Sequence, residues 1–177
     1  MHSINGSKTK AKLRDLWRTP KPVFDYFDKL YNFNLDAYAS ESDKLCENFI
    51  GESDNSHSVD WSDYTNGDSV RAFCNPPYSQ PNIRMALEKA KSEAKRGSLS
   101  LVLIPNQPAK YWAESVVGYA RAITLTLGRI SFVDPVTGLP ISGNPGGSAF
   151  ILYTPTNHRI RRVETVTEYL SVDELMS

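Results

Sequence analysis

The sequence predicts one α/β domain whose sheet is mostly parallel, with antiparallel strands near its C-terminal end. Strand-like apolar runs alternate with helical patterns through the first two thirds of the chain, an order typical of parallel sheets. The run 99–104 is almost wholly apolar, as expected for a strand buried on both faces. Two or three strand-like runs then lie close together after residue 121, and this short spacing favours antiparallel pairing.

The first third of the chain is expected to hold a polar arm, two helices and a strand. Residues 1–14 form the arm and residues 15–177 the single domain. Thr19 is the expected N-cap of the first helix, with Pro20 at its first helical position. The apolar face of that helix repeats at helical spacing: Val23, Phe24, Phe27 and Leu30. Next come a strand at 33–36, a second helical stretch at 37–50 and a polar loop at 51–58.

The rest of the chain continues this alternation and ends in a strand. A strand at 69–74 leads to a long amphipathic helix, 79–96, which Gly97 is expected to end. The remaining elements are, in order, a strand at 99–104, a helix at 108–118, strands at 122–127 and 129–133, a turn-rich loop at 134–147 and a final strand at 148–153. The glycine-rich end of that loop precedes a strand rather than a helix, so it predicts a hairpin turn and not a phosphate-binding loop.

Composition places the chain among ordinary globular proteins. Its 177 residues, 40% of them hydrophobic, can bury a core within one domain. No apolar run is long enough to span a membrane and the N-terminus lacks a signal-peptide core, so a cytoplasmic location is expected. Two cysteines and three scattered histidines give no pattern for a metal site. The formal net charge is zero, although basic residues near both ends could leave one basic face for phosphates.

Asn75-Pro76-Pro77-Tyr78, hereafter the acceptor loop, lies between the strand at 69–74 and the helix at 79–96. Ligands of open α/β sheets bind outside the carboxyl ends of strands, where this loop is expected. The two prolines fix φ and remove two N–H donors, so the loop offers mainly carbonyl acceptors. The Asn75 amide adds an oxygen and Tyr78 adds a flat ring. These residues favour chemistry on a planar group that carries an exocyclic NH₂.

The acceptor loop is one of an ordered set of motifs that runs from Trp17 to the last expected strand. The set is Trp17-x-Thr19-Pro20, Phe33-x-Leu35-Asp36-x-x-Ala39, Asp60-Trp61, Asn75-Pro76-Pro77-Tyr78-Ser79, Leu103-Ile104-Pro105, Trp112, Gly128-Arg129-Ile130-x-Phe132 and Gly147-Ser148-Ala149-Phe150. With these motifs, the chain resembles the phage-type DNA N6-adenine methyltransferases of the Dam-like family. The resemblance implies a Rossmann-like methyltransferase fold, S-adenosylmethionine as methyl donor and adenine N6 in DNA as acceptor.

The acceptor loop suits this chemistry because the adenine N6 lone pair is delocalised into the ring and is a poor nucleophile. The Asn75 side-chain oxygen and the Pro76 carbonyl are expected to accept one N6 hydrogen each, which directs the lone pair at the methyl group. Pro77 is expected to keep the loop rigid. Tyr78 is expected to stack on a target base flipped out of the duplex. No general base is needed before methyl transfer.

The expected donor site lies before the acceptor loop. Asp36 ends the first strand, where this fold usually starts its donor site, and is expected to contact the methionine part or the ribose. Asp60 is expected to accept from the donor's adenine amino group, with a helix-capping role as the alternative. Nearby acids that could take its place stay open, namely Asp54, Asp63 and Asp68. The segment that closes over the donor in such enzymes resembles three residues here: Trp17, Thr19 and Pro20.

DNA is the expected partner, with contacts from Arg129 and from the loop that contains Asn144. The chain leaves little length for a separate recognition domain, so further contacts must come from the termini or from the second subunit of a homodimer. The resemblance suggests GATC as the target. Two enzymatic alternatives use the same loop, on a protein glutamine amide or on adenine in RNA. A silent nucleic-acid-binding module is the third, because no glycine-rich turn follows Asp36.

Overall fold

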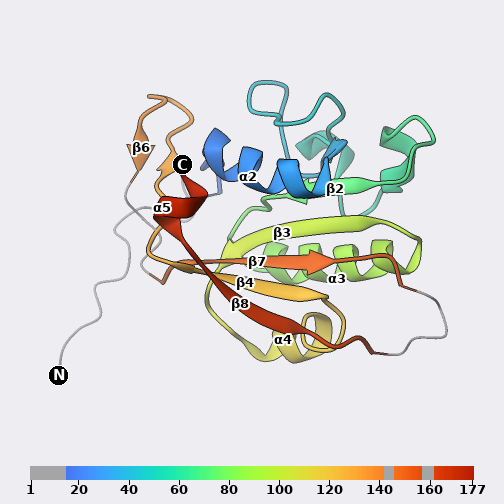
Figure 1. Cartoon of the computed structure of the whole chain (residues 1–177). Coiled ribbons are helices and arrows are strands. Elements are labelled where there is room, and N and C mark those ends of the chain that lie inside the picture. Colours follow the sequence, from blue (N-terminus) through green and yellow to red (C-terminus); the bar gives the residue numbers. More distant parts are fainter. Residues whose placement is uncertain (1–14, 142–145, 157–161) are drawn as a thin grey trace.

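The computed structural model describes residues 15–141, 146–156 and 162–177 (Figure 1). The expected arm at 1–14 lies outside these residues. Six strands form one sheet in the order β1-β2-β3-β7-β4-β8. Their bounds are Leu35–Asp36 for β1, Arg71–Cys74 for β2, Leu99–Pro105 for β3, Ser148–Tyr153 for β7, Ala122–Leu127 for β4 and Val166–Ser171 for β8. β7 runs antiparallel to both of its neighbours and the other pairs are parallel, so the predicted α/β class and mixed sheet are confirmed.

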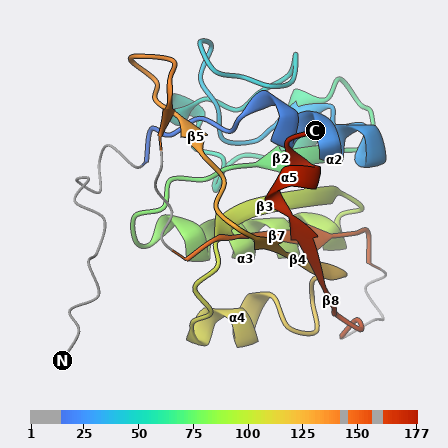
Figure 2. The same cartoon turned by 60° about the vertical axis from the view of Figure 1, so that its left-hand side comes forward.

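Helices cover both faces of the sheet, as Figure 1 shows. One face packs against α3 (Asn82–Lys95) and α4 (Lys110–Ser115). The other face packs against α2 (Lys21–Tyr31) and the short C-terminal α5 (Val172–Leu175), which lies beside α2 (Figure 2). No helix in the described part of the chain combines the length and apolarity that spanning a membrane requires.

The central strands are apolar on both faces because they lie between two helical layers. In β3, Val102 and Ile104 belong to the core under α3, whereas Leu101 and Leu103 belong to the core under α2. Phe73 of β2 also lies in the α2 core, and its neighbours in the sequence face the α3 core. This arrangement explains why the run 99–104 shows almost no alternation of apolar and polar residues.

The first helix differs from its prediction at both ends. Pro20 occupies the N-cap position and no side chain caps the helix, so Thr19 is not the cap and Pro20 is not inside the helix. The first helical hydrogen bond joins Phe24 N to Pro20 O, at 3.3 Å. Val23, Phe24 and Phe27 are buried as expected, but Leu30 is 63% exposed because the face has turned towards solvent by the last turn.

The segment 37–50 is not helical, contrary to prediction. Its last residues return beside β1 in parallel, where Asp36 N donates to Asn48 O at 3.0 Å and Ile50 N donates to Asp36 O at 2.9 Å. These backbone bonds take the groups that a helix would have used, so tertiary pairing overrides the local pattern. These residues, hereafter the return segment, thus extend the sheet by one short parallel bridge beyond β1.

The second half of the chain follows its prediction with three differences. Gly97 ends α3 as expected, since its φ of +98° lets Gly97 N reach Ala94 O and Ser98 N reach Glu93 O. α4 is shorter than the expected helix at 108–118. The strand expected at 129–133 is reduced to β5 (Phe132–Val133), which forms a hairpin with β6 (Pro140–Ile141). β7 is not the last strand, because β8 follows it.

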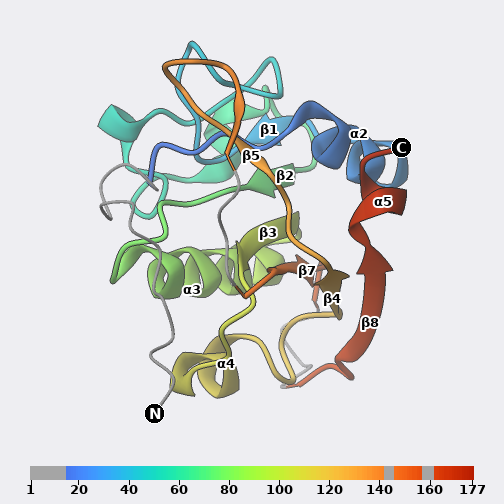
Figure 3. The ribbon, with the colours of Figure 1, turned by 90° about the vertical axis from the view of Figure 1, so that its left-hand side faces the viewer.

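The strand directions bring several loops to one edge of the sheet. The carboxyl ends of β1, β2, β3, β4 and β8 all point the same way, since β7 alone is reversed. Figure 3 shows the β5–β6 hairpin standing near the loops that follow β1 and β2. The hairpin is tied to the chain before α2 by two backbone bonds between Arg18 and Val133, of 3.0 and 2.9 Å. The described loops therefore converge where ligands of such sheets bind.

The α2 core gives a stability prediction with an internal control. Phe27 is 3% exposed and its ring centroid lies 4.4 Å from that of Phe150. Phe27→Ala is expected to lower the free energy of unfolding by about 3–5 kcal/mol, because it leaves a cavity between helix and sheet. Leu30→Ala, three residues further on, is expected to stay within about 0.5 kcal/mol of the wild type. Urea unfolding measures both, and equal losses would contradict the described face of α2.

Candidate active site

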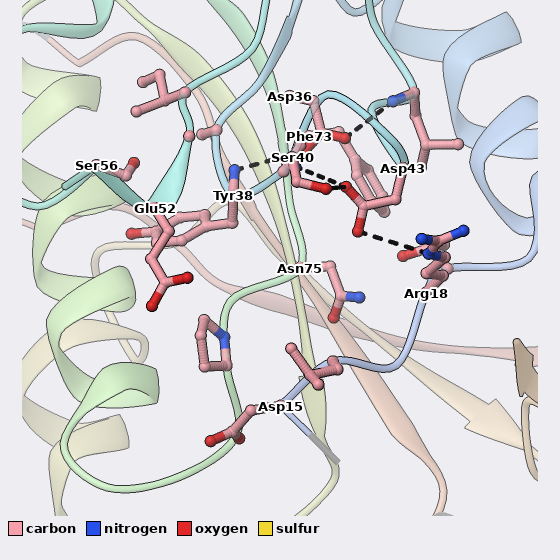
Figure 4. Close-up of a pocket in the computed structure, with 18 of the residues that line it drawn as sticks. Asp15, Arg18, Asp36, Tyr38, Ser40, Asp43, Glu52, Ser56, Phe73 and Asn75 are labelled. Atoms are coloured by element: carbon pink, nitrogen blue, oxygen red, sulfur yellow. Dashed lines mark hydrogen bonds and ion pairs between the residues drawn. The ribbon is translucent and has the colours of Figure 1, made fainter. Parts of the chain in front are cut away.

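A cavity of about 520 Å³ opens at the carboxyl edge of the sheet. The loops after β1 and β2 form two of its walls, and residues 15–18, hereafter the strap, form a third. Pro135 of the β5–β6 hairpin also contributes to the lining. In Figure 4, Asn75 lies between Asp36 and Asp15, with Glu52 and Arg18 on opposite sides. The volume falls within the range of small-molecule sites, about 300–1,000 Å³.

Asn75 is oriented by the strap. Its Nδ2 donates to the Trp17 carbonyl at 3.3 Å. Its Oδ1 is buried and has no hydrogen-bond partner among the described residues. A buried acceptor without a donor costs about 1–3 kcal/mol, so such groups in native proteins call for a functional explanation. An incoming N–H donor would satisfy Oδ1.

The other three residues of the acceptor loop, Pro76, Pro77 and Tyr78, are wholly or partly buried. Pro77 lines the cavity and Pro76 is buried, but neither Pro76 nor Tyr78 is among the lining residues. The Tyr78 ring packs edge-on against Phe132 of the hairpin, with centroids 6.0 Å apart. The Tyr78 hydroxyl is buried without a partner among the described residues. Tyr78 therefore reaches the hairpin side of the loop rather than this cavity.

Asp36 is a buried carboxyl in the wall of the cavity, 4% exposed. It accepts hydrogen bonds from the backbone N–H of Leu45 at 3.1 Å and of Tyr38 at 3.4 Å, and so holds the loop that follows β1. Burial raises the pKa of Asp36 to about 7, and the two backbone bonds oppose this shift. A cation placed in the cavity would restore the carboxylate.

Glu52 is another acid that lines the cavity, and the sequence pattern did not identify it. The return segment pairs in parallel with β1 through Phe49, so Glu52, which follows that segment, lies towards the same edge as Asp36, the last residue of β1. The Glu52 side chain is exposed to the cavity that it lines. The signal was present in the sequence, because an apolar pair, Phe49-Ile50, ends shortly before an acid just as Leu35 precedes Asp36.

The end of the cavity near Glu52 also carries an aromatic and polar wall. The Tyr38 hydroxyl and His57 Nδ1 lie 3.2 Å apart. Burial, together with nearby Lys89, lowers the pKa of His57. Ser56 is buried beside them and accepts a hydrogen bond from Trp61 Nε1 at 3.1 Å. The wall therefore offers a ring face and neutral hydrogen-bonding groups.

Asp60 is placed outside this cavity. It caps the short 3₁₀ helix η2 (Trp61–Tyr64), accepting from Ser62 N at 3.1 Å, and it pairs with Arg96. The helix-capping alternative thus describes its contacts in the structure. Its three sequence alternatives do not line the cavity either: Asp54, Asp63 and Asp68.

The other expected site residues differ in where the structure places them. Trp17 and Thr19 line the cavity, whereas Pro20 does not. Arg129 is exposed just after β4, at the same edge of the sheet. Asn144 lies outside the described residues.

Comparison with known proteins gives one family. A family model described as DNA N-6-adenine-methyltransferase (Dam) matches residues 6–176. A DNA N-6-adenine-methyltransferase of Escherichia phage T1 is 30% identical over 168 residues, which cover 83% of this chain and 66% of that protein, just under two thirds. The protein of the same name from Haemophilus phage HP1 is 29% identical over 152 residues, covering 84% of each chain.

Among solved structures, a protein from Listeria monocytogenes described as a class I S-adenosylmethionine-dependent methyltransferase aligns with a TM-score of 0.47. The alignment covers 86% of this chain and 54% of that chain, at 10% sequence identity.

Asp36 makes stability depend on pH. Because its folded pKa of about 7 lies above the unfolded value of 3.8, the folded state holds the proton more tightly. The free energy of unfolding is therefore expected to fall as pH rises from about 4 to about 7, by at most about 4 kcal/mol from this group. Asp36→Asn removes the titration, so the variant should gain on the wild type over that range. Unfolding curves at matched pH measure this difference, and a constant offset between pH 4 and pH 8 would refute the assignment.

Proposed function

This chain belongs to the DNA N-6-adenine-methyltransferase (Dam) family, and on that premise we propose that it transfers a methyl group to N6 of adenine in DNA. We place the reaction where the acceptor loop meets the cavity at the carboxyl edge of the sheet. The observation that carries this proposal is the buried Asn75 Oδ1, an acceptor without a partner among the described residues. A target amino group brings the hydrogens that this atom lacks.

The residues around the cavity fit the methyl donor of the family, S-adenosylmethionine. When bound, this cofactor supplies an electrophilic methyl group on a sulfonium. Asp36 and Glu52 are two of the four acids in the lining, and they suit a cationic amino-acid part and ribose hydroxyls. We assign Asp36 to the cationic part, where the buried carboxyl would become ionised, and Glu52 to the hydroxyls. Tyr38 offers an aromatic face near Glu52.

Asn75 and Pro76 act on the target nitrogen in this proposal. Asn75 Oδ1 accepts one N6 hydrogen and the Pro76 carbonyl accepts the other. Both acceptors are fixed before the reaction, so they stabilise the positive charge that develops on N6 without reorganising. Pro77 keeps the loop in shape, since its ring fixes φ.

Access to N6 requires that the adenine leave the base stack. In the structure, Tyr78 packs edge-on against Phe132, so a stacked base must either use the free part of the ring or displace that contact. Arg129, which follows β4 at this edge, remains our candidate for a phosphate contact. A homodimer would supply further DNA contacts from its second subunit.

Family membership favours DNA over the two other substrates that the acceptor loop could serve, a glutamine amide and adenine in RNA. The remaining alternative is a silent binding module, and the residues of the site bear on it. The acids Asp36 and Glu52 in the cavity wall and the free acceptor of Asn75 favour the enzyme, because a silent module needs none of them.

Labelled methyl transfer tests the proposal. Protein and tritiated S-adenosylmethionine are incubated with duplex DNA, RNA or a glutamine-containing peptide, and digested products are analysed for N6-methyladenine. Transfer is expected to DNA alone. Asn75→Ala is expected to reduce the rate by about 10²-fold or more. Its affinity for S-adenosylhomocysteine, measured by calorimetry, should not change.

Two outcomes would contradict the proposal. Label on RNA or peptide but not DNA would assign the loop to another substrate. Donor affinity that falls together with activity in Asn75→Ala would place Asn75 on the donor rather than the target amine.

Glu52 and Asp60 give a second, independent test of the donor site. Glu52→Gln replaces one of the two carboxylate oxygens by an NH₂ group, which cannot accept from a second ribose hydroxyl, and removes the charge. Binding of S-adenosylhomocysteine is therefore expected to weaken by about 10- to 100-fold, the usual value of a lost hydrogen bond to a charged acceptor. Asp60→Asn, the matched loss of a carboxylate outside the cavity, should leave binding unchanged. Calorimetry on both folded variants decides. The reverse ranking would restore the assignment that sequence alone suggested for Asp60.

A further inference from the structure

Building on the proposed function, we propose that the strap, residues 15–18, is a positioning element of methyl transfer and not only a cover over the donor. Its Trp17 carbonyl sets which way the Asn75 amide faces. Its Asp15 carboxylate holds the far end of the acceptor loop. The two contacts fix the loop at both ends, one at its first residue and one at the residue that follows Tyr78.

The Trp17 carbonyl selects one of the two orientations of the Asn75 amide. In the orientation present, Nδ2 donates to this carbonyl at 3.3 Å and Oδ1 is left free. The reversed orientation would bring two oxygen lone pairs together and would present NH₂ to the target. An NH₂ group cannot accept a hydrogen from N6, so reversal removes the acceptor that the reaction needs.

Asp15 holds the other end of the loop. Its Oδ1 accepts a hydrogen bond from the backbone N–H of Ser79 at 2.8 Å. Ser79 directly follows Tyr78, the last residue of the acceptor loop, so this bond restrains the loop at its C-terminal end. A charged acceptor makes such a bond stronger than a neutral one.

The strap itself is anchored away from the loop. Arg18 pairs with Val133 of the β5–β6 hairpin through two backbone bonds, and the Trp17 ring stacks on Phe132 at 5.9 Å. On its other side, Arg18 donates to Ser42 at 3.2 Å. The strap therefore joins the hairpin to the acceptor loop, and a rigid strap can hold the loop without help from a bound donor.

The positioning role and a donor-contact role predict different kinetic changes. Asp15 lines the cavity, so a carboxylate that bound the donor would show its loss as weaker donor affinity. A carboxylate that positions the loop would show its loss as a lower kcat at unchanged donor affinity. Asn at position 15 separates charge from hydrogen bonding, because its amide oxygen can still accept from Ser79.

The experiment compares Asp15→Ala, Asp15→Asn and the wild type. Asp15→Ala is expected to lower kcat for DNA methylation by about 10- to 100-fold, as for other small misplacements of a reacting group. Its affinity for S-adenosylhomocysteine should be unchanged, and Asp15→Asn should recover most of kcat. Asp25→Ala is the control for the loss of one carboxylate, since among the described residues the Asp25 side chain pairs with Lys21 on the surface of α2.

Amide hydrogen exchange gives a readout that needs no activity. Exchange at Ser79 N–H is expected to quicken in Asp15→Ala and to stay slow in Asp15→Asn. An unchanged kcat in Asp15→Ala, a loss in Asp15→Asn as large as in Asp15→Ala, or a loss confined to donor affinity would overturn the inference. A wild type that transfers no methyl group to DNA would refute the proposed function instead, and the exchange rates would still confirm or refute the strap contact.

Discussion

Asn75 Oδ1 is kept out of water with no donor among the described residues, and the arrangement of the site depends on this one acceptor. The loop cannot satisfy it locally, because the two residues that follow are prolines and lack N–H groups. The amide cannot satisfy it by turning, because its nitrogen is bonded to the Trp17 carbonyl. The unfavourable energy of the empty acceptor is offset only when a donor enters, which favours a substrate that carries an amino group.

Asp36 shows the same principle at the other end of the site. Burial raises the pKa of its carboxyl to about 7, so the ionised form is disfavoured in the free protein. A cationic ligand would remove that penalty. Two groups in the cavity wall are therefore in unfavourable states. Asn75 Oδ1 lacks a donor, which an amino group would supply. The ionised form of Asp36 is disfavoured, and a cation would stabilise it. The rigid strand ends hold both groups, so the protein does not have to rearrange to present them.

The sequence predicted the class of fold and the acceptor loop because both depend on local patterns. The alternation of strands and helices is visible in the chain, and the two prolines fix the loop wherever it lies. The return of 48–50 beside β1 could not be predicted from local pattern, because it is made by backbone bonds to Asp36 from residues more than ten positions away. Glu52 depends on that return and was therefore missed. Asp60 is an acid near the expected donor site, but its carboxylate caps η2 and pairs with Arg96 instead. β8 was missed because its residues are mostly exposed and show little apolar pattern.

A crystal structure with S-adenosylhomocysteine tests the central claim most directly, namely that the donor and Asn75 meet in the cavity at the carboxyl edge of the sheet. The account predicts the ligand between Asp36 and Glu52, with its ribose hydroxyls at Glu52 and its sulfur towards Asn75. It also predicts that Asn75 Nδ2 still donates to the Trp17 carbonyl and that Oδ1 stays free. A ligand bound elsewhere, or an Asn75 Oδ1 occupied by a protein donor, would contradict it.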